Sequence, residues 1–242
     1  MKKFFKCLLA SLFLATCINA NDILKVGTNA TYPPFEYIDQ NSKITGFDMD
    51  LIDELSKRIG FKYEIVNMGF DALIPALKSG KIDAIAAAMS ATPQRIKAVD
   101  FTNPYYTTEN LFIKKSSNAA INSKDDLIGK KIGVQLGTVQ EIAAREIKGS
   151  KVVPTKDIFN SIMALKNNKV DAVLVDSSIG YGYLNKNDDL TEFLKEPDGS
   201  EGFSIAFDKN KHTELIEKIN EEVDKMKQDG TYEKLLKQYE LK

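Results

Sequence analysis

Two different spacings of apolar residues alternate along the first part of the chain. Residues 23–28, 61–66 and 82–89 are short apolar or alternating runs. Between them, apolar side chains three or four positions apart over 47–59 and 70–78 predict helices with one buried face. The run over 82–89 is typical of a strand covered on both faces of a parallel sheet. The pattern therefore predicts strand, helix, strand, helix, strand, with right-handed crossovers.

A second unit of the same kind follows. Its predicted elements are a strand at 131–135, a helix at 139–147, a strand at 152–153, a helix that starts at Asp157 and a buried strand at 170–175 that ends at Asp176. Residues 77–85 also resemble residues 165–173, position by position, as a helix end, a turn and a strand. We interpret the two units as lobes of similar architecture. Chance similarity between two ordinary α/β units is the alternative.

The tail predicts a return to the first lobe. Residues 196–202 are a flexible passage, residues 203–207 form a strand, and two amphipathic helices complete the chain. We therefore predict an α/β protein with two lobes, each a mostly parallel sheet flanked by helices. The first lobe would hold 21–108 and 203–242, and the second 109–202. Two crossings between two lobes make a hinge.

The segment after the run at 82–89 is the first candidate for binding. Polarity changes at Ser90, Thr92 can cap a helix with its hydroxyl, and Pro93 suits the first helical position. Arg95 then falls in the first turn, where the helix dipole disfavours a cation. Free N–H groups and a guanidinium together would hold a carboxylate or phosphate. The alternative is a simple surface pair with Asp100.

Residues 1–20 have the features of a secretory signal. Three lysines precede an apolar run over 8–18, which is too short to span a membrane, and Ala20 ends a small-residue cleavage site. Cleavage there would remove both cysteines, Cys7 and Cys17. The mature chain would be periplasmic, without disulfides or thiol chemistry. Processing as a lipoprotein at Cys17 is the alternative.

Charge and residue types narrow the classes of function. Without residues 1–20 the chain has 30 basic and 34 acidic residues, which argues against nucleic acid or an anionic membrane as a partner. The single histidine, His212, makes a catalytic triad or a histidine metal site improbable. No phosphate-binding glycine motif is present, so nucleotide binding has no support. With one histidine and no cysteine in the mature chain, we expect no cofactor and no metal.

The remaining polar and aromatic residues suit a zwitterion. Arg95 and the amide nitrogens near Thr92 and Thr138 could hold a carboxylate. Asp176 could hold an ammonium group, and Tyr32 and Phe70 could form apolar walls. Each also has a structural alternative. Phe70 can be ordinary core, Asp176 can cap the next helix, and Tyr32 can be a turn aromatic.

Several longer motifs carry a family resemblance. They are residues 29–36 (NATYPPFE), 46–51 (GFDMDL), 70–77 (FDALIPAL), 89–95 (MSATPQR), 101–106 (FTNPYY), 133–138 (GVQLGT), 170–172 (VDA) and 229–232 (DGTY). In this order they resemble the periplasmic polar amino-acid-binding proteins of ABC importers, across essentially the whole mature chain. The resemblance implies a type II periplasmic binding fold whose two lobes close on an amino acid.

The resemblance also implies a set of ligand-binding residues. The set is Asn29, Tyr32, Phe70, Ala88, Met89, Ser90, Arg95, Gln135, Thr138, Gln140 and Asp176. By this resemblance Tyr32 and Phe70 would sandwich the ligand side chain. Arg95 would grip the α-carboxylate.

The α-ammonium group of the ligand would have three implied partners. They are the Ala88 carbonyl, the Ser90 hydroxyl and the Asp176 carboxylate, while Thr138 would donate to the α-carboxylate. Asn29 departs from the aspartate that some basic-amino-acid binders have at this position, so neutralisation of a cationic side chain is open at this point.

The ligand expected from the sequence is a basic amino acid, arginine first and histidine or lysine next. Stacked aromatics suit a flat guanidinium. Asn29 and Gln135 could supply neutral acceptors, which keeps glutamine as the main rival. The expected partner is a membrane ABC permease, and the protein is expected to be a monomer and not an enzyme. A dehydratase-like enzyme on the same fold and the sensor domain of a membrane kinase are the alternatives.

Overall fold

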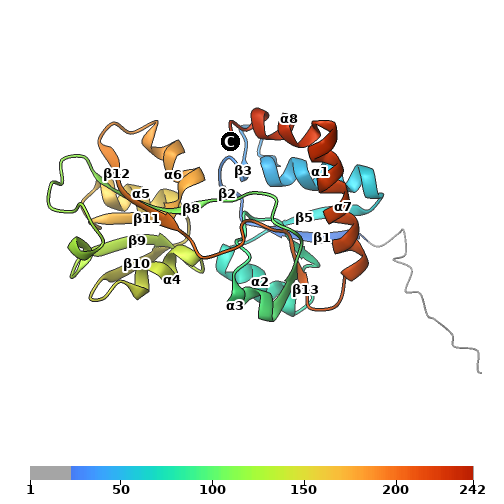
Figure 1. Ribbon diagram of the computed structural model, residues 1–242, viewed down its shortest axis with the longest axis horizontal. Coiled ribbons are helices and arrows are strands. Elements are labelled where there is room, and N and C mark those ends of the chain that lie inside the picture. Colours follow the sequence, from blue (N-terminus) through green and yellow to red (C-terminus); the bar gives the residue numbers. More distant parts are fainter. Residues whose placement is uncertain (1–22, 242) are drawn as a thin grey trace, which may run out of the picture.

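The structure is a computed structural model that describes residues 23–241. It has two lobes lying side by side, joined by two extended crossings of the chain (Figure 1). The expected signal segment and both cysteines lie outside the described residues. No helix in the described part is long and apolar enough to cross a membrane.

The first lobe is built on a five-stranded sheet. In spatial order its strands are β5 (Lys62–Asn67), β1 (Ile23–Thr28), β6 (Ala84–Ile85), β13 (Ala206–Asp208) and β7 (Val99–Phe101). β1 is parallel to β5 and to β6, as the crossovers predict, whereas β13 is antiparallel to β6 and β7. The last strand of this lobe thus comes from the tail of the chain.

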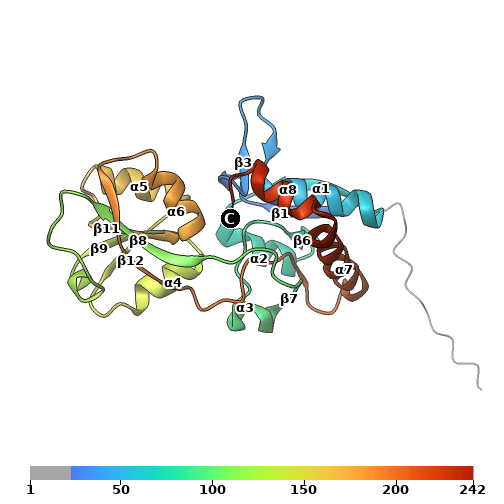
Figure 2. The same ribbon diagram turned by 45° about the horizontal axis from the view of Figure 1, so that its top comes forward.

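Helices cover the first sheet, and a small second sheet stands beside it. The helices are α1 (Phe47–Ile59), α2 (Phe70–Lys78), α3 (Pro93–Ala98), α7 (Thr213–Asp229) and α8 (Thr231–Gln238). The small sheet is formed by β2 (Thr31–Tyr32), β3 (Glu36–Ile38) and β4 (Ile44–Thr45). Figure 2 shows its hairpin rising away from α1 and α8.

The second lobe has its own five-stranded sheet. In spatial order its strands are β10 (Lys151–Thr155), β9 (Lys131–Gln135), β11 (Ala172–Asp176), β8 (Glu109–Lys115) and β12 (Leu190–Pro197). Its helices are the 3₁₀ helix η1 (Asp125–Leu127), α4 (Val139–Glu146), α5 (Ile158–Lys166) and α6 (Ser177–Leu184). β9 pairs in parallel with β10 and β11, and β8 runs antiparallel to β11.

The sequence echo between the two lobes has a structural counterpart. Asp83 accepts a hydrogen bond from the backbone nitrogen of Lys25 at 2.9 Å, and Asp171 accepts one from the backbone nitrogen of Lys131 at 2.7 Å. In each lobe a carboxylate just before one strand thus accepts a hydrogen bond from a backbone nitrogen of the neighbouring parallel strand. The corresponding residues, Asp83 and Asp171, therefore form the same type of hydrogen bond in both lobes.

Two predicted strands were wrong in extent, and so was a passage predicted to be flexible. The run at 82–89 forms only the two-residue β6, because the chain leaves the sheet after Ile85 and Ala88 takes a positive φ of 44°. The tail strand is β13 and begins at Ala206 rather than at residue 203. The passage at 196–202 is partly ordered, since β12 continues to Pro197 by pairing with β8.

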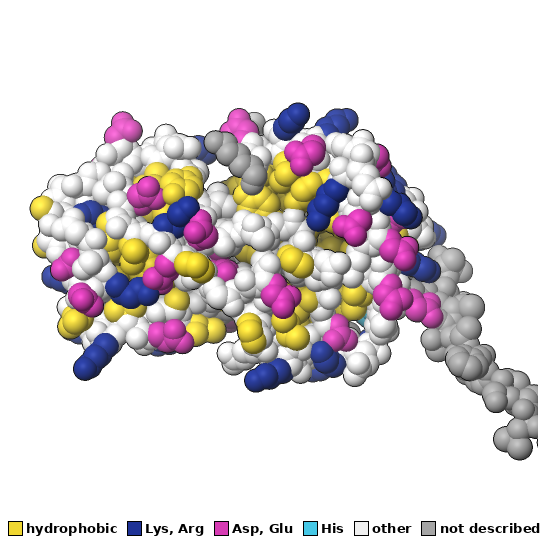
Figure 3. Space-filling view, in the orientation of Figure 1, with side chains coloured by type: hydrophobic (Ala, Val, Ile, Leu, Met, Phe, Trp, Pro, Cys, Tyr) yellow, Lys and Arg dark blue, Asp and Glu magenta, His cyan; other side chains and the backbone are white. Residues whose placement is uncertain are grey.

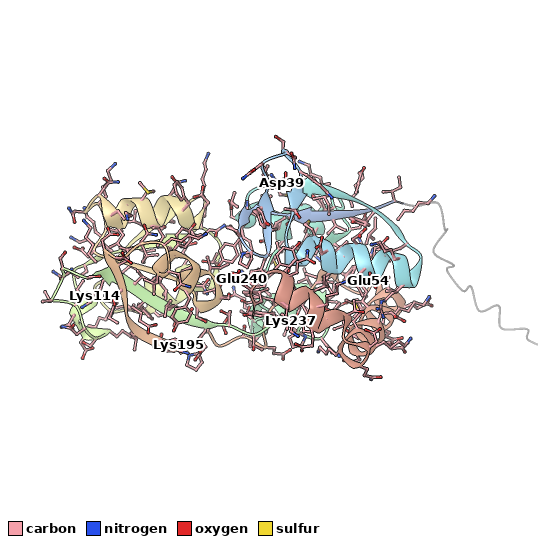
Figure 4. All side chains as sticks on the ribbon, turned by 90° about the horizontal axis from the view of Figure 1, so that it is seen from above. Asp39, Glu54, Lys114, Lys195, Lys237 and Glu240 are labelled. Carbon is pink, nitrogen blue, oxygen red and sulfur yellow. The ribbon has the colours of Figure 1, made fainter. Side chains whose placement is uncertain are left out.

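The boundary between the lobes leaves a groove at the surface. The walls of this groove include Pro33 and Tyr106 from the first lobe and Tyr183 from the second. Figure 3 shows hydrophobic side chains on both flanks of the gap between the lobes. In Figure 4 Glu240, near the end of the described chain, lies beside this gap, while Lys114 belongs to the far lobe. The same boundary encloses the candidate site.

Candidate functional site

A cavity between the lobes brings most of the predicted binding residues together. It is lined by Asn29, Tyr32, Glu36, Phe70, Ala87, Ala88, Ser90, Arg95, Gln135, Thr138, Val139, Gln140 and Asp176. Ten of the eleven residues expected from the sequence are on this wall. The exception is Met89, whose buried side chain packs in the core of the first lobe with Leu73 and Leu77.

The aromatic residues of the cavity come from two elements of the first lobe. Tyr32 ends β2, and its hydroxyl donates to Oδ2 of Asp176 at 2.5 Å, across the boundary between the lobes. Phe70 starts α2, and the guanidinium carbon of Arg95 lies 5.4 Å from the centre of its ring. The Phe70 ring therefore already stacks against one planar cation, which is the geometry a second guanidinium could use.

Arg95 forms its hydrogen bonds with backbone carbonyls. Its Nη1 donates to the Ser90 carbonyl at 2.9 Å and its Nη2 donates to the Gly137 carbonyl at 2.9 Å. None of the ion pairs among residues 23–241 includes Arg95, and Asp100 pairs instead with Lys209. Burial lowers the pKa of Arg95 to about 10, which leaves it cationic at neutral pH. A cation without an ion pair, at a cavity wall, suits a ligand carboxylate.

The local sequence around Arg95 behaves as predicted. Thr92 accepts a hydrogen bond at its hydroxyl from the backbone nitrogen of Arg95, and Pro93 occupies the first turn of α3. The cap fixes the start of this short helix, which places the Arg95 side chain toward the second lobe. The partner there, Gly137, has a φ of +81°, and a Cβ at this position would lie 2.9 Å from Cα of Asp71. Only glycine lets the lobes approach this closely.

The second lobe supplies a chain of polar contacts that ends at Asp176. Asp176 is the last residue of β11 and is buried, and Gln140 donates from Nε2 to its Oδ1 at 2.9 Å. Burial raises the pKa of Asp176 to about 7, although the hydrogen bonds from Tyr32 and Gln140 work in the opposite direction. A cationic group of a ligand placed beside Asp176 would stabilise the ionised form of this buried carboxylate.

Thr138 can serve the ligand only with its backbone. Its hydroxyl donates to the Gln135 carbonyl at 2.8 Å and accepts from the backbone nitrogen of Glu141 as the cap of α4. The hydroxyl proton is therefore already committed. What Thr138 offers is the N–H at the start of a helix, which favours an anion.

Two amide side chains meet across the lobes at another side of the cavity. Nε2 of Gln135 donates to Oδ1 of Asn29 at 2.9 Å, while Asn29 donates to the Met68 carbonyl at 2.9 Å. Oε1 of Gln135 is buried and has no hydrogen-bond partner among the described residues. Because an amide oxygen without a partner is costly when buried, it favours a ligand that donates a hydrogen bond.

Glu36 is a cavity residue with ionisable chemistry that the sequence reasoning did not select. It lies on β3 opposite Tyr32 of β2, with 1% of its surface exposed, and its Oε2 has no partner among the described residues. Burial and the nearby carboxylates of Asp48 and Asp176 raise the pKa of Glu36 well above its ordinary value. The sequence feature that could have identified Glu36 is its position as the last residue of the motif over 29–36, directly after Phe35.

The backbone at Ala88 has a conformation that is unusual for alanine. Its φ of 44° is in the left-handed region, which costs roughly 1–2 kcal/mol for a residue with a Cβ. No hydrogen bond from the described residues reaches the Ala88 carbonyl, which is therefore free to accept one from a ligand. Ser90 follows, and its hydroxyl donates to Oδ2 of Asp198 at 3.3 Å.

Taken together, the fold and the cavity define a binding protein whose two lobes enclose a small polar ligand. The wall holds an unpaired cation, buried carboxylates and aromatic rings contributed by the described residues. Groups of this kind on both lobes mean that a ligand in the cavity would contact both halves at once.

Comparison with known proteins identifies the family. The chain belongs to family 3 of the bacterial extracellular solute-binding proteins, whose model matches residues 24–242. A probable histidine-binding protein of Campylobacter jejuni is 49% identical over the whole of both chains. An arginine-binding extracellular protein of Bacillus subtilis, ArtP, is 37% identical over 89% of this chain and 85% of its own.

Solved structures agree in fold. An ancestral arginine-binding protein bound to arginine superposes with a TM-score of 0.84 at 40% identity, covering 90% of this chain and 97% of its own. An ancestral arginine-binding protein bound to glutamine gives a TM-score of 0.83 at 40% identity, with the same coverage. The two-lobed periplasmic binding fold expected from the sequence is thus confirmed, and so is the family resemblance.

Proposed function

We propose that this protein captures an L-amino acid with a cationic side chain between its lobes and delivers it to an ABC permease. Arginine is the first candidate, followed by histidine and lysine. The observation that carries the proposal is Glu36, a buried carboxylate on the cavity wall whose Oε2 has no partner among the described residues. An unpaired buried carboxylate is costly unless a cation or a proton joins it.

The position of Glu36 suits the far end of an arginine side chain. Glu36 lies opposite Tyr32 in the β2–β3 pair, so the carboxylate sits beside an aromatic wall. Phe70 supplies the other aromatic of the cavity. A guanidinium is planar and weakly hydrated, so it can stack on rings while its N–H groups reach the carboxylate. The charge that Asn29 lacks is thereby supplied by a different residue.

The groups common to all amino acids have their own partners in this proposal. Arg95 and the Thr138 N–H hold the α-carboxylate, since Arg95 has no ion pair of its own among the described residues. Asp176 and the Ala88 carbonyl hold the α-ammonium group. A zwitterion would in this way bind to both lobes and favour the closed arrangement.

The names of the relatives favour a basic amino acid as the ligand and leave glutamine as the alternative. Proteins named for histidine and for arginine are among the similar chains, and an ancestral arginine-binding protein is also described with glutamine. The unpartnered Oε1 of Gln135 could accept from the amide of a bound glutamine. Glutamine is therefore the second candidate, and it would leave Glu36 without a cation.

The setting of the proposed function is outside the cytoplasm. The family is extracellular, and we infer that residues 1–20 direct export to the periplasm, with Cys17 lipidation as the alternative. The lobes, 21–108 with 203–242 and 109–202, would close as two bodies about the crossings. We propose a monomer that binds without catalysis and has no nucleic-acid partner, because charged side chains of both signs are mixed on the face in Figure 3.

The test is a thermal-shift panel of the twenty amino acids on protein refolded free of carried-over ligand. A ligand that binds only the folded state raises the free energy of unfolding by about 2.7 kcal/mol at a hundredfold excess over its dissociation constant. We expect arginine, histidine or lysine to give the largest shifts. Strong stabilisation by glutamine or glutamate, with none by the basic amino acids, would overturn the choice of ligand but leave the solute-binding role.

A further inference from the structure

Asp48 lies behind the cavity wall and holds part of that wall in place. It is in the first turn of α1, is 1% exposed and does not line the cavity. Its Oδ2 accepts two hydrogen bonds, from the backbone nitrogen of Ala88 at 2.7 Å and from the hydroxyl of Tyr105 at 2.7 Å. Ala88 does line the cavity, so Asp48 touches the site through one backbone N–H.

That N–H belongs to the residue with the positive φ. Nothing in the alanine side chain favours φ of 44°, and Ala88 lies beyond the end of β6. The backbone pairs again after Ala88, where the Met89 carbonyl accepts from the backbone nitrogen of Ser204. The buried hydrogen bond of 2.7 Å to Asp48 is an external constraint on this backbone, because a buried N–H without an acceptor is costly. The Ala88 N–H lies in the same peptide plane as the Ala87 carbonyl, so this hydrogen bond fixes that plane. The Ala88 carbonyl lies in the next plane, and the unusual φ of Ala88 sets its direction relative to the fixed one.

The Asp48 carboxylate is itself held in place. The Tyr105 hydroxyl that donates to it belongs to a residue whose carbonyl accepts a hydrogen bond from the Tyr232 hydroxyl of α8. The rings of Phe47 and Tyr105 also stack, with centroids 6.0 Å apart. The site backbone is thus tied, through Asp48 and Tyr105, to α8 at the far end of the chain.

We propose that Asp48 is a positioning residue for ligand recognition: by binding the Ala88 N–H, it keeps the Ala88 carbonyl directed at the ligand's α-ammonium group. The inference rests on the proposed function, in which that carbonyl accepts from the ammonium. The proposal predicts that Asp48 affects recognition of the α-ammonium group and of no other part of the ligand. The hydrogen-bond acceptor is what matters, not the negative charge.

The charged and titratable groups around Asp48 are consistent with this role. Glu36, Tyr105 and Tyr232 all lie close enough to Asp48 to interact with it electrostatically. Burial raises the pKa of Asp48 to about 7, against the effect of its two hydrogen bonds. No cation among the described residues pairs with Asp48, so its structural partners are the two donors named above.

The test compares arginine with 5-guanidinopentanoate, which is arginine without the α-amino group. Dissociation constants of both are measured by calorimetry for the wild type, Asp48→Asn and Asp48→Ala. The Asp48→Asn variant is the matched control, because its amide oxygen can still accept from Ala88 and Tyr105 without a charge. We expect the preference for arginine over the analogue to stay within about threefold of the wild type in Asp48→Asn. In Asp48→Ala it should fall roughly tenfold or more, the value of a hydrogen bond to a charged group.

The ratio of the two constants separates positioning from general damage. A merely structural role would weaken both ligands alike and leave the ratio unchanged in Asp48→Ala, which would refute the proposal. If the ratio fell as much in Asp48→Asn as in Asp48→Ala, the charge of Asp48 would be responsible. That result would also refute the proposal. If the wild type bound neither compound, the proposed function itself would have failed.

Two further arms keep the test decisive if Asp48→Ala does not fold. Asp48→Leu fills similar space without an acceptor and should lose the same preference. Amide hydrogen exchange of Ala88 in the wild type with arginine bound needs no substitution. We expect this N–H to be protected, and rapid exchange at Ala88 in the complex would contradict the proposal.

Discussion

Substitution of Glu36 by glutamine is the sharpest test of the proposed ligand class. The change keeps the shape of the side chain and removes only its charge. Glu36 is 1% exposed, and its Oε2 has no partner among the described residues. A cationic ligand would therefore lose its main counter-charge. A neutral ligand would lose nothing of that kind.

The size of the effect follows from burial. Removal of one partner of a buried, hydrogen-bonded charge pair costs about 2–5 kcal/mol, or roughly thirtyfold to several thousandfold in affinity. We expect the lower part of this range, because Asp48 and Asp176 keep negative charge near the same cavity. The dissociation constant for arginine should thus rise by roughly thirtyfold to a few hundredfold. The constant for glutamine should stay level or fall.

The assay is calorimetry with arginine and glutamine on the wild type, Glu36→Gln and a control, Glu64→Gln. Glu64 is an exposed residue of β5 and should have no effect on either ligand. Arginine affinity in the wild type should also weaken as the pH is lowered. The pKa of Glu36 is raised by burial, so acid protonates the carboxylate while the guanidinium stays charged. Glu36→Gln should show a flatter profile.

One result would refute this reasoning directly. If Glu36→Gln bound arginine as tightly as the wild type, with the same pH profile, the cationic end of the ligand would not lie at Glu36. A loss of equal size for arginine and glutamine would instead point to general damage at the β2–β3 pair. Thermal unfolding without ligand would then identify that damage.

Three other predictions test the remaining parts of the site. Arg95→Ala should weaken every amino-acid ligand by roughly thirtyfold or more while leaving the fold intact by circular dichroism; near-wild-type affinity would place the carboxylate anchor elsewhere. Small-angle scattering should give a smaller radius of gyration with arginine than without it, and an unchanged radius would argue against lobe closure. The pKa of Asp176 is raised from its ordinary value of 3.8 to about 7 in the folded protein. Between these two pH values the folded state therefore keeps a proton on Asp176 that the unfolded state has released. The contribution of Asp176 to stability is therefore fully present below the ordinary value of 3.8 and is lost as the pH rises through about 7. Asp176→Asn should flatten the pH dependence of the melting temperature between about pH 4 and 7.

Elements set by local contacts could be predicted from the sequence. β1 spans residues 23–28 as expected, α1 ends before Gly60, whose φ is +89°, and Thr92 caps α3. Periodicity, a left-handed glycine and a hydroxyl cap act within one or two turns of the chain, so neighbouring residues alone carry the information. The carboxyl ends of the parallel strands also indicated the correct edge of each sheet for the candidate binding site.

Only the tertiary structure decided which polar side chains lack a partner. Nothing in the sequence around Glu36 shows that it pairs opposite Tyr32 and lines a cavity shared with the second lobe. The hydrogen-bond partner of the Ala88 N–H, beyond the end of β6, is likewise Asp48, which is forty residues away in the sequence. Burial and hydrogen-bond partners are properties of residues distant in sequence. The ends of the predicted strands and the family resemblance therefore indicated which residues line the cavity, and the packing of the two lobes determined which of them lack a partner.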